Sequence, residues 1–569
     1  MDNVVQYTEI AGDNFSPIIT DRLDKTEPLM FDTETVTLYG KIRLAQFYQK
    51  GWKDVLLVHN PDAIELVLLL SKTHFVAHHS HYDITTIQKI IDIPWVPDKF
   101  DDTLYLSRLY YYANDKYSLD NCLTYLFGYN PYKEHFNLSK SVMQKSDWGA
   151  SKLTEDQKIY SASDVIYLQD LWDIVKVKTN TAVYKLDIKA LRNALVFQNN
   201  GLPVDKNELK KQYDNNTKMI RDINLPINCN SFKQVREYIN SSHSDDEGLA
   251  KLAIEGNTKA KDVRTTRKLI KQNSFLSKFD TIDDRIYGKF SPTAKSGRFR
   301  CSDQNLQQLP RATKNCFGVS EDSGKVILYT DFSQLELRCV CSITNDSVML
   351  RLFEQDIDIH TFAAQKIFHT EEPTKEQRRI AKYCNFGLLY GAGANVLIKL
   401  LIQNADVLLD YNEALQYCVQ WRNIWPKIRA WQKQGIKDWQ DNIAWQTPMG
   451  RQYTAISMTD QLNIQIQGMG SEVAKLALYF MEKALEQEFG KESTNWLSNF
   501  IHDAYLYTLP NDKTMYTKIA QLIATSMQDA WKEISSLCLV KNLAMPVTVH
   551  VGYNWGKIEN GEVLYTHKQ

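Results

Sequence analysis

The sequence lacks three features that would assign it to a broad class of protein. No apolar run approaches the roughly 20 residues that a membrane-spanning helix needs, which excludes an integral membrane protein. The nine cysteines include no C-x-x-C pair, which argues against a structural zinc site and indicates reduced thiols in a cytoplasmic protein. Residues 1–15 are acidic and polar, unlike a signal or transit peptide.

An excess of basic residues is also absent, because 67 Lys and Arg face 68 Asp and Glu, for a net charge of −1. This balance does not exclude a nucleic-acid-binding protein, since phosphate binding requires only local clusters of cations. An enzyme rich in metal-binding carboxylates reaches the same neutrality. Aromatic residues make up 11% of the chain, which suits base stacking and suits a hydrophobic core equally well.

A chain of 569 residues is too long for one hydrophobic core and predicts about three to four compact units. Neither an internal repeat nor a low-complexity linker is present in the sequence. Apolar patterns predict strands within residues 29–59 and helices after them, and this order indicates an α/β domain that ends near residue 180. A charged helical region then extends to about 280. A strand from 325, a helix-rich stretch over 346–458 and closing strands follow it.

Four carboxylates in the first third of the chain form a candidate metal site. Asp32 and Glu34 lie two residues apart in the apolar strand FDTET, so both side chains point to one face. Two neighbouring acids repel one another unless a cation lies between them. Asp83 starts a helical pattern, and Asp164 lies one helical turn beyond Tyr160 in IYSASDVIYL. Each acid alone is typical of a surface charge or a helix cap, but together they are the groups that two-metal phosphodiester hydrolysis requires.

In this order and spacing, the four acids and the tyrosine resemble the DEDDy pattern of 3′→5′ proofreading exonucleases. The segments SVMQKSDWG and LTEDQKIYSASDVIYL are similar to the same family. The resemblance implies that the four acids hold two divalent ions (Mg²⁺, Mn²⁺ or Zn²⁺) and that Tyr160 orients the attacking water. One position departs from the pattern, because His79 replaces the asparagine that usually precedes the second-motif aspartate by four residues.

His79 belongs to a group of four histidines, together with His74, His78 and His81. Their crowding leaves two interpretations open: a zinc cluster, or a polar loop whose histidines face solvent or substrate. We favour the loop, because it is the commoner outcome for such a segment.

The second half of the chain carries a further series of motifs, beginning with SGRFRCSDQNLQQLP at Ser296. This segment resembles T-G-R-L-S-S-x-x-P-N-L-Q-N-I-P of family A DNA polymerases, the bacterial DNA polymerase I type, although Ser296 and Gln304 replace Thr and Pro. The resemblance implies that Arg298, Asn305 and Gln307 contact the minor groove of the primer-template. The N3 and O2 acceptors there are common to every correct base pair.

The segment YTDFSQLELR is close to motif A of the same family. The strand VILYT delivers Asp331 to its end, where a carboxylate can bind metal ions. Glu336 matches the residue that crowds the sugar 2′ position, which implies deoxyribonucleotide substrates. A single-subunit RNA polymerase shares the general layout but not this segment, so DNA synthesis is favoured.

The segment RRIAKYCNFGLLYG places Arg378, Lys382, Phe386 and Tyr390 at every fourth residue. Each step of four drifts by about 40° around a helix, so the four side chains form one slowly turning stripe. An amphipathic helix with aromatic core contacts explains the spacing alone, but the match to R-x-x-x-K-x-x-x-F-G-x-x-Y-G favours a dNTP-binding helix. It implies that the cations neutralise the triphosphate, that Lys382 protonates pyrophosphate and that the rings contact the incoming sugar and base. The upstream DIDIHTFAA implies that His360 lies near the phosphates.

Two later segments complete the series. LNIQIQGMGSEVAK resembles N-x-x-x-Q-G-x-x-x-D/E and implies minor-groove contacts by Asn463 and Gln467. NFIHDAYLYTL resembles motif C and predicts two short strands with His502, a DNA contact, and Asp503 at their turn. Asp503 and the motif A aspartate would together hold two Mg²⁺ (or Mn²⁺) ions. Ala504 departs from the usual His-Asp-Glu, so we expect activity to survive with altered metal affinity or primer positioning.

The basic segment RTTRKLIKQ, with Arg264, Arg267, Lys268 and Lys271, resembles the thumb helices that grip duplex phosphates. On this interpretation Arg267 and Lys271 contact DNA. A solvated charged helix face explains the segment equally well, and the two interpretations stay open.

The resemblance extends over about residues 28–557. It implies an α/β exonuclease domain, ribonuclease H-like with a mixed sheet and helices, followed by an α+β right-hand polymerase domain of palm, fingers and thumb. We expect the exonuclease domain over 1–185, the thumb over 186–280, the palm over 281–345 and 459–569, and the fingers over 346–458.

The implied function is that of a template-directed DNA polymerase that extends a primer with dNTPs and proofreads in the 3′→5′ direction. The length, with no 5′-nuclease domain before it, favours a bacteriophage replicative enzyme. We expect a monomer in the cytoplasm (of the host, if viral), with no membrane association. Its partners would be primer-template DNA, dNTPs and replisome proteins such as helicase, primase and single-strand binding protein. Two alternatives stay open: an exonuclease whose polymerase domain binds DNA but is weakly active, and a non-enzymatic DNA clamp.

Overall fold

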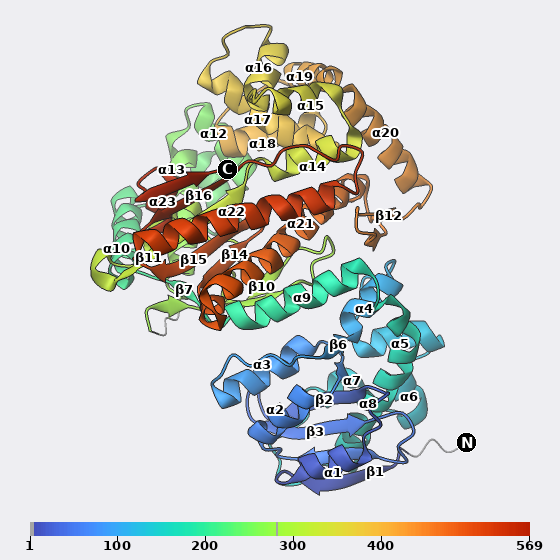
Figure 1. Ribbon diagram of the computed structural model, residues 1–569. Coiled ribbons are helices and arrows are strands. Elements are labelled where there is room, and N and C mark those ends of the chain that lie inside the picture. Colours follow the sequence, from blue (N-terminus) through green and yellow to red (C-terminus); the bar gives the residue numbers. More distant parts are fainter. Residues whose placement is uncertain (1–4, 280–282) are drawn as a thin grey trace. The chain divides into compact units, whose positions relative to one another are not determined.

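The computed structural model describes residues 5–279 and 283–569, and these divide into two compact units (Figure 1). Unit 1 contains the chain up to residue 199 and two short segments, 291–293 and 450–452. Unit 2 contains the rest, from residue 200 onward. Within the described ranges, no helix combines the length and the apolar character that crossing a bilayer requires.

Unit 1 is built on a six-stranded mixed sheet with the order β1-β4-β3-β2-β5-β6. Its strands are β1 (Tyr7–Ala11), β2 (Leu29–Thr35), β3 (Ile42–Tyr48), β4 (Val55–His59), β5 (Phe75–Ala77) and β6 (Phe100–Asp102). β3 runs antiparallel to both of its neighbours, and the other pairs are parallel. The strands expected within residues 29–59 are thus confirmed as β2, β3 and β4.

Helices cover the sheet of unit 1. They are α1 (Phe15–Arg22), α2 (Ala63–Lys72), α3 (Ser80–Ile91), α4 (Thr103–Tyr110), α5 (Leu119–Phe127), α6 (Pro131–Phe136), α7 (Lys140–Met143), α8 (Glu155–Val175) and α9 (Ala182–Phe197). Phe31, Phe47 and Phe75 are fully buried in the core and their rings pack directly on one another. α8 packs against β2, β3 and β4, and begins at a capping box in which Thr154 and Gln157 bond each other's backbone N–H. The expected domain boundary at 185 falls within α9, which belongs to unit 1.

Unit 2 contains a five-stranded antiparallel sheet with the order β14-β15-β11-β16-β17. The strands are β11 (Lys325–Phe332), β14 (Leu497–Ile501), β15 (Ala504–Pro510), β16 (Val547–Gly552) and β17 (Tyr565–Lys568). The long helices α21 (Met458–Phe489) and α22 (Lys513–Ser535) pack on each other, and α22 packs against four of the strands. Because β11 lies at the centre, both of its neighbours can bring side chains to its end.

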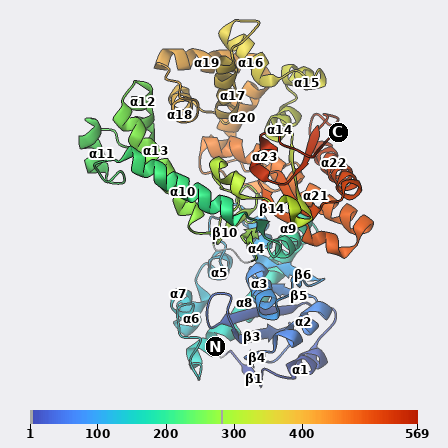
Figure 2. The ribbon, with the colours of Figure 1, turned by 90° about the vertical axis from the view of Figure 1, so that its left-hand side faces the viewer.

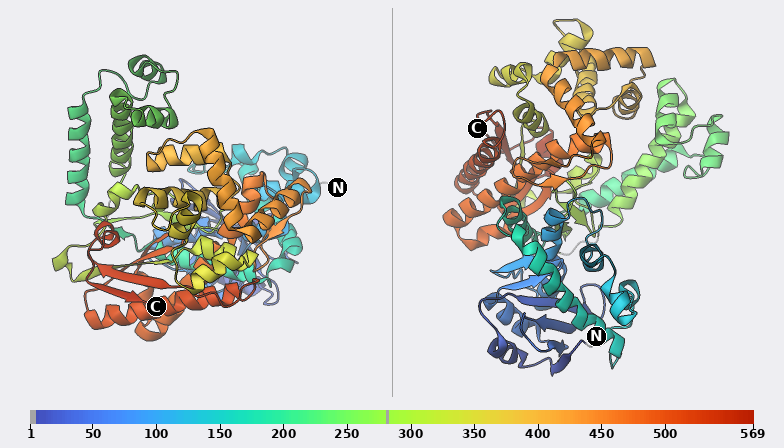
Figure 3. Two further views of the ribbon diagram at one scale, coloured as in Figure 1. Left: turned by 90° about the horizontal axis from the view of Figure 1, so that it is seen from above. Right: turned by 90° about the vertical axis from the view of Figure 1, so that its right-hand side faces the viewer.

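Two groups of helices accompany this sheet (Figures 2 and 3). The first is α10 (Lys206–Ile223), α11 (Phe232–Ile239), α12 (Asp246–Ile254) and α13 (Thr258–Leu276). The second is α14 (Leu335–Thr344), α15 (Ser347–Glu354), α16 (Ile359–Phe368), α17 (Lys375–Leu389), α18 (Ala394–Ala405), α19 (Tyr411–Ile424) and α20 (Pro426–Gln440). In these views α10–α13 and α15–α20 form two groups within this unit, and they meet where α12 packs against α18. The expected boundary between thumb and palm at 280/281 lies outside the described residues.

One carboxylate joins two helices of the second group. Asp346 is fully buried, and its Oδ1 accepts hydrogen bonds from the N–H groups of Val348 and Met349 at the start of α15. Its Oδ2 accepts another, at 2.9 Å, from Lys427 N at the start of α20. The side chain therefore satisfies orphan donors of two helix N-termini at once.

We expect Asp346→Ala to lower the free energy of unfolding of unit 2 by about 2–4 kcal/mol, because three N–H groups at two helix starts lose the buried carboxylate that accepts from them. Asp346→Asn keeps one acceptor oxygen and should lose less. Urea denaturation followed by circular dichroism measures the difference. If Asp346→Ala lowers the free energy of unfolding no more than Asp322→Ala, a substitution at an exposed acid, then Asp346 does not stabilise the two helix starts.

Candidate active sites

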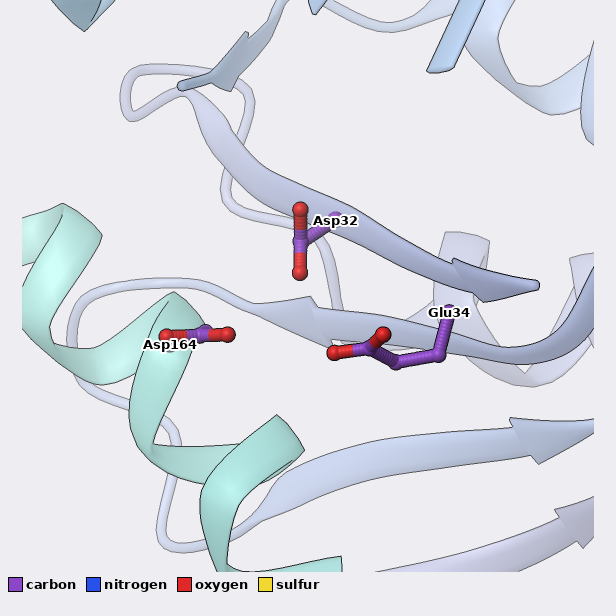
Figure 4. A group of neighbouring side chains, drawn as sticks. All are labelled: Asp32, Glu34 and Asp164. Carbon is purple, nitrogen blue, oxygen red and sulfur yellow. The ribbon is translucent and has the colours of Figure 1, made fainter. Parts of the chain in front are cut away.

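Three carboxylates of unit 1 converge as the sequence predicts. β2 presents Asp32 and Glu34 on one face, and α8, which packs across that strand, supplies Asp164. One oxygen from each of the three carboxylates lies within 4.8 Å of the other two. Figure 4 shows the side chains from the strand and from the helix directed toward one another. Oxygen ligands so close together suit a divalent cation such as Mg²⁺ or Mn²⁺.

The fourth acid, Asp83, joins the same cavity but is held apart from the group of three. It lies in the first turn of α3, and Thr33 Oγ1 donates to its Oδ1 at 2.6 Å. The cavity has a volume of about 710 Å³, and all four acids and Tyr160 line it. The structure therefore places the five predicted exonuclease residues at one site.

Burial and crowding disfavour the ionised form of these acids. Burial, followed by repulsion from Asp83 and Asp164, holds the pKa of Asp32 well above its usual range. Burial and the Asp164 charge do the same to the pKa of Glu34. Burial raises the pKa of Asp83 to about 7, although the hydrogen bond from Thr33 opposes the shift. A bound cation is the group that would relieve this accumulation of negative charge.

Two tyrosines contact Asp164. Tyr160, one turn earlier on α8, is buried and its hydroxyl lies beside that carboxylate, on the helix face that the spacing predicts. Tyr132 on α6 also donates its hydroxyl hydrogen to Asp164 Oδ1, and its ring lies 5.7 Å from the ring of Tyr160. Sequence reasoning missed Tyr132. Pro131 at the first position of α6 and Asn130 before it signal a helix start, but not which acid that helix faces.

The four histidines do not form a metal cluster. The only group of ligand-type side chains that meets among the described residues is the acidic one. His74 pairs with Asp101, whereas His78 bonds Thr103 and the Tyr117 carbonyl. His79 is exposed, lines the cavity and has a left-handed backbone (φ 70°) just before α3. The favoured polar loop is wrong for His81, which lies within α3, is buried and contacts Gln198.

Asp102 is another residue that the sequence reasoning missed. It is fully buried, and its carboxylate accepts hydrogen bonds from the backbone N–H groups of His79, Ser80 and Leu104. These bonds secure the starts of α3 and α4, so Asp102 fixes the position from which Asp83 reaches the cavity.

In unit 2, sheet pairing brings the two polymerase carboxylates together. Asp331 lies near the end of β11, and Asp503 lies in the turn between β14 and β15. Thr330 pairs with Tyr505 across β11 and β15, which places the turn beside the end of β11. Burial, followed by repulsion from Asp331, raises the pKa of Asp503 to about 7. The predicted hairpin of motif C is confirmed, and Ala504 is its first buried residue on β15.

Glu336, at the start of α14, connects two other predicted residues. Arg298 Nη2 lies 2.9 Å from its Oε1, and the Tyr390 hydroxyl donates to its Oε2 at 2.6 Å. The carboxylate is therefore held by two elements that are distant in sequence. A side chain held in this way can act as a steric wall.

The predicted nucleotide-binding stripe lies on α17, with Tyr390 at its C-terminal end. Arg378 makes a bidentate ion pair with Asp358, and Lys382 is exposed. The ring of Phe386 lies 5.7 Å from that of His360 on α16. Arg378 and Lys382 are exposed, Phe386 and Tyr390 are half-buried, and His360 is buried beside Phe386.

His360 is held in one tautomer. Asn385 Nδ2 lies 2.9 Å from His360 Nδ1, and Asn385 Oδ1 accepts from Trp421 Nε1. With this amide orientation Nδ1 is the acceptor, which leaves Nε2–H as the donor. Burial lowers the pKa of His360 to about 4, so the ring is neutral near pH 7.

The predicted minor-groove residues differ in how they are held. Gln307 Nε2 donates to the Phe500 carbonyl, and Asn305 Oδ1 accepts from the backbone of Gln307. Asn463 lies on α21 with a buried Oδ1 that has no hydrogen-bond partner among the described residues. Gln467 lies one turn further along α21, and His502 is exposed in the motif C turn with φ 58°. Their DNA contacts stay predictions.

The basic residues of helix α13 divide between structural and exposed positions, so neither of the two interpretations that the sequence left open applies to the whole segment. Arg267 donates to the backbone carbonyls of Cys229 and Ser244, and Arg264 pairs with Asp246 and Asp406. Both guanidinium groups thus hold helices of unit 2 together, which disfavours the predicted DNA contact of Arg267. Lys268 and Lys271 are exposed, and a DNA contact by Lys271 stays a prediction.

Comparison with known protein families identifies the family to which this chain belongs. The profile described as DNA polymerase family A matches residues 200–557, and the profile described as 3′-5′ exonuclease matches residues 8–180. The chain belongs to DNA polymerase family A. It is a DNA polymerase with a 3′→5′ exonuclease domain, and the family and function that the motifs imply are confirmed.

Relatives and a solved structure agree with this assignment. DNA polymerase I of Aquifex aeolicus is 26% identical, with 97% of this chain and 100% of the relative covered. DNA polymerase I of Borreliella burgdorferi (23%) is matched over 78% of this chain and about half of its own length. Thermostable DNA polymerase I of Thermus thermophilus (27%) is matched over 47% of this chain and about a third of its own length.

The POL domain of Pol1 from M. smegmatis, solved in complex with DNA primer-template and dNTP, has the same fold. The TM-score is 0.76 at 17% identity, and the match covers 96% of this chain and 99% of that one. The predicted fold class is thereby confirmed.

Asp83 yields a test of the crowded acids in the metal-free enzyme. Its folded pKa of about 7 lies above the usual unfolded value, so stability falls as the pH rises from about 4 to 7. In EDTA, Asp83→Asn should therefore raise the melting temperature of unit 1 clearly at about pH 8 and much less at about pH 5.5. Asp98→Asn, at an exposed carboxylate of the same unit, is the matched control. A gain independent of pH would show that Asp83 does not titrate in this window.

Proposed function

We propose that this DNA polymerase extends a primer by two-metal phosphoryl transfer and removes 3′-terminal nucleotides at a second two-metal site. The observation that carries the proposal is the acidic cluster in each unit. In unit 1, Asp32, Glu34 and Asp164 have carboxylate oxygens within 4.8 Å of one another, and in unit 2, Asp331 lies beside the turn that holds Asp503. Desolvation is the main cause that raises the pKa values of these acids. When bound, divalent ions acidify the attacking oxygen and stabilise the leaving oxygen at either site.

In the exonuclease unit, Asp32, Glu34 and Asp164 would hold one ion, and Asp83 together with Asp32 would hold the second. Mg²⁺, Mn²⁺ and Zn²⁺ all suit these donors. Tyr160 would orient the attacking water, because its hydroxyl lies beside Asp164.

In the polymerase unit, Asp331 and Asp503 would hold two Mg²⁺ or Mn²⁺ ions. Lys382 would bind the triphosphate and protonate the departing pyrophosphate, and the Nε2–H of His360 would donate to a phosphate oxygen. Arg378 would bind the triphosphate through the guanidinium edge that Asp358 leaves open. Phe386 and Tyr390 would contact the incoming sugar and base.

DNA contacts complete the proposal. Arg298, Asn305, Gln307, Asn463, Gln467 and His502 would contact the primer-template, with Lys271 on the duplex phosphates. The neighbour that was solved with primer-template and dNTP supports these ligands. The cellular role proposed is replication of the bacteriophage type, by a cytoplasmic monomer with helicase, primase and single-strand binding protein as partners.

Asp331→Asn or Asp503→Asn should lower primer extension with Mg²⁺ and four dNTPs by about three orders of magnitude, because each removes a charged metal ligand. Degradation of a mismatched 3′ end should persist in both variants. Asp32→Ala should do the reverse, and Asp322→Asn, at an exposed acid, is the control.

The outcomes separate the alternatives. Wild-type protein that degrades 3′ ends but never extends them would establish the exonuclease with a weakly active polymerase domain. If the wild-type protein has neither activity, the non-enzymatic DNA clamp is the interpretation that remains. Loss of both in one variant would indicate misfolding of that variant.

Sugar selection tests the Glu336 contacts. Glu336→Ala removes the wall that Arg298 and Tyr390 hold, so incorporation of ribonucleotides relative to deoxyribonucleotides should rise about 10- to 200-fold. Tyr390→Phe removes one of the two bonds and should give a smaller rise. Single-nucleotide incorporation kinetics with dCTP and CTP measure the ratio, and an unchanged ratio in Glu336→Ala would remove Glu336 from sugar selection.

A further inference from the structure

The exonuclease cavity contains a cation that the family motifs do not include. Lys140 is the first residue of α7 and lines the same cavity of about 710 Å³ as the four acids. Its Nζ lies 5.9 Å from the centre of the Tyr132 ring, which itself contacts Asp164. The ammonium group is therefore held over an aromatic ring at the acidic end of the cavity.

Lys140 is not a direct counter-ion of the acids. Across the described ranges of the chain, no carboxylate oxygen lies within the 4.0 Å of an ion pair with its Nζ. Its charge nevertheless reaches them, because it lowers the pKa of Glu34 and Asp164 against the larger effect of burial. It also lowers the pKa of Asp32, but less than three neighbouring acids raise it. Lys140 and the four acids therefore line one cavity without a direct ion pair between them.

The group that enters this space during proofreading is itself an anion. Under the proposed function, the substrate is a single-stranded 3′ end whose last phosphodiester must approach four carboxylates. Divalent ions offset part of that repulsion, but a phosphate oxygen that faces away from them still needs a donor. A lysine that lines the same cavity without pairing with the acids supplies that donor and leaves the metal positions free.

We propose that Lys140 is a substrate-binding residue of the exonuclease site, whose ammonium group contacts a non-bridging oxygen of the scissile phosphate. The proposal rests on the proposed exonuclease function. The same phosphate stays on the 5′ carbon of the released nucleoside monophosphate, so Lys140 also contacts the product. Sequence reasoning missed it because a lone lysine in LSKSVMQ is typical of a solvated surface.

Product binding tests the contact without any turnover. The protein is the full chain with Asp331→Asn, so that the exonuclease site alone keeps its acids, and the probes are dTMP and thymidine at saturating Mg²⁺. Lys140→Met keeps the aliphatic stem but removes the charge, and should weaken dTMP binding by about tenfold or more in calorimetry. Thymidine, which lacks the phosphate, should bind both proteins equally, and Lys140→Arg should restore most of the dTMP affinity.

Lys133→Met is the matched control, because Lys133 is exposed on α6 and does not line the cavity. Equal dTMP affinity in Lys140→Met and Lys133→Met would overturn the proposal. Mn²⁺ titration of the same proteins supplies a second readout, because Lys140→Met should not weaken the binding of a cation as it weakens the binding of dTMP. Removal of a cation beside the acids should tighten Mn²⁺ binding or leave it unchanged.

Weaker binding of both Mn²⁺ and dTMP in Lys140→Met would make Lys140 a structural residue and would also overturn the proposal. Failure of the underlying function is distinguishable. If protein that is wild type except for Asp331→Asn neither degrades a single-stranded 3′ end nor binds dTMP, the exonuclease assignment itself fails. If this protein does both, and Lys140→Met and Lys133→Met bind dTMP equally, the exonuclease assignment is retained and only the Lys140 contact is rejected.

Discussion

Repulsion among closely spaced carboxylates is the constraint on which the exonuclease unit depends. Asp32, Glu34 and Asp164 bring oxygens within 4.8 Å of one another in a cavity where burial alone raises their pKa values. Negative charges so arranged are unfavourable unless each is hydrogen-bonded or shares a cation. Hydroxyl groups meet this requirement in part, because Tyr132 and Tyr160 lie against Asp164 and Thr33 donates to the neighbouring Asp83. The remaining negative charge is what makes the site a strong cation ligand.

The polymerase unit meets the same constraint with fewer acids and a different scaffold. Antiparallel pairing of β11 with β15 sets Asp331 beside the turn that holds Asp503, so sheet register fixes their relation. The Tyr329 hydroxyl, two residues back on the same strand, donates to Asp331. Both acids have raised pKa values, so proton release and metal binding are coupled at this site as well.

Several parts of this arrangement were predictable because the signal is local. A strand with acids at alternate positions, a helix with a cation–aromatic stripe and a hairpin with His502–Asp503 at its turn follow from side-chain periodicity. His81 and Arg267 were not predictable in the same way. His81 belongs to a histidine-rich segment that is typical of a polar loop, but it lies within α3 and contacts Gln198. Arg267 belongs to a basic segment that resembles DNA-binding helices, but its guanidinium group donates to two backbone carbonyls. Each partner lies far along the chain or on another element, where no local pattern shows it.

The sequence by itself determined the chemistry of both sites, because the identity and spacing of Asp32, Glu34, Asp83, Asp164 and Tyr160, and of Asp331 and the α17 stripe, specify which groups each element presents. Tertiary structure alone decided how those groups are tuned. Lys140, Tyr132 and Asp102 act on the exonuclease acids from helices and loops that meet β2 and α8 only in the folded chain. The reason is physical: hydrogen bonds and charges act through space over a few ångströms, and sequence distance carries no record of them.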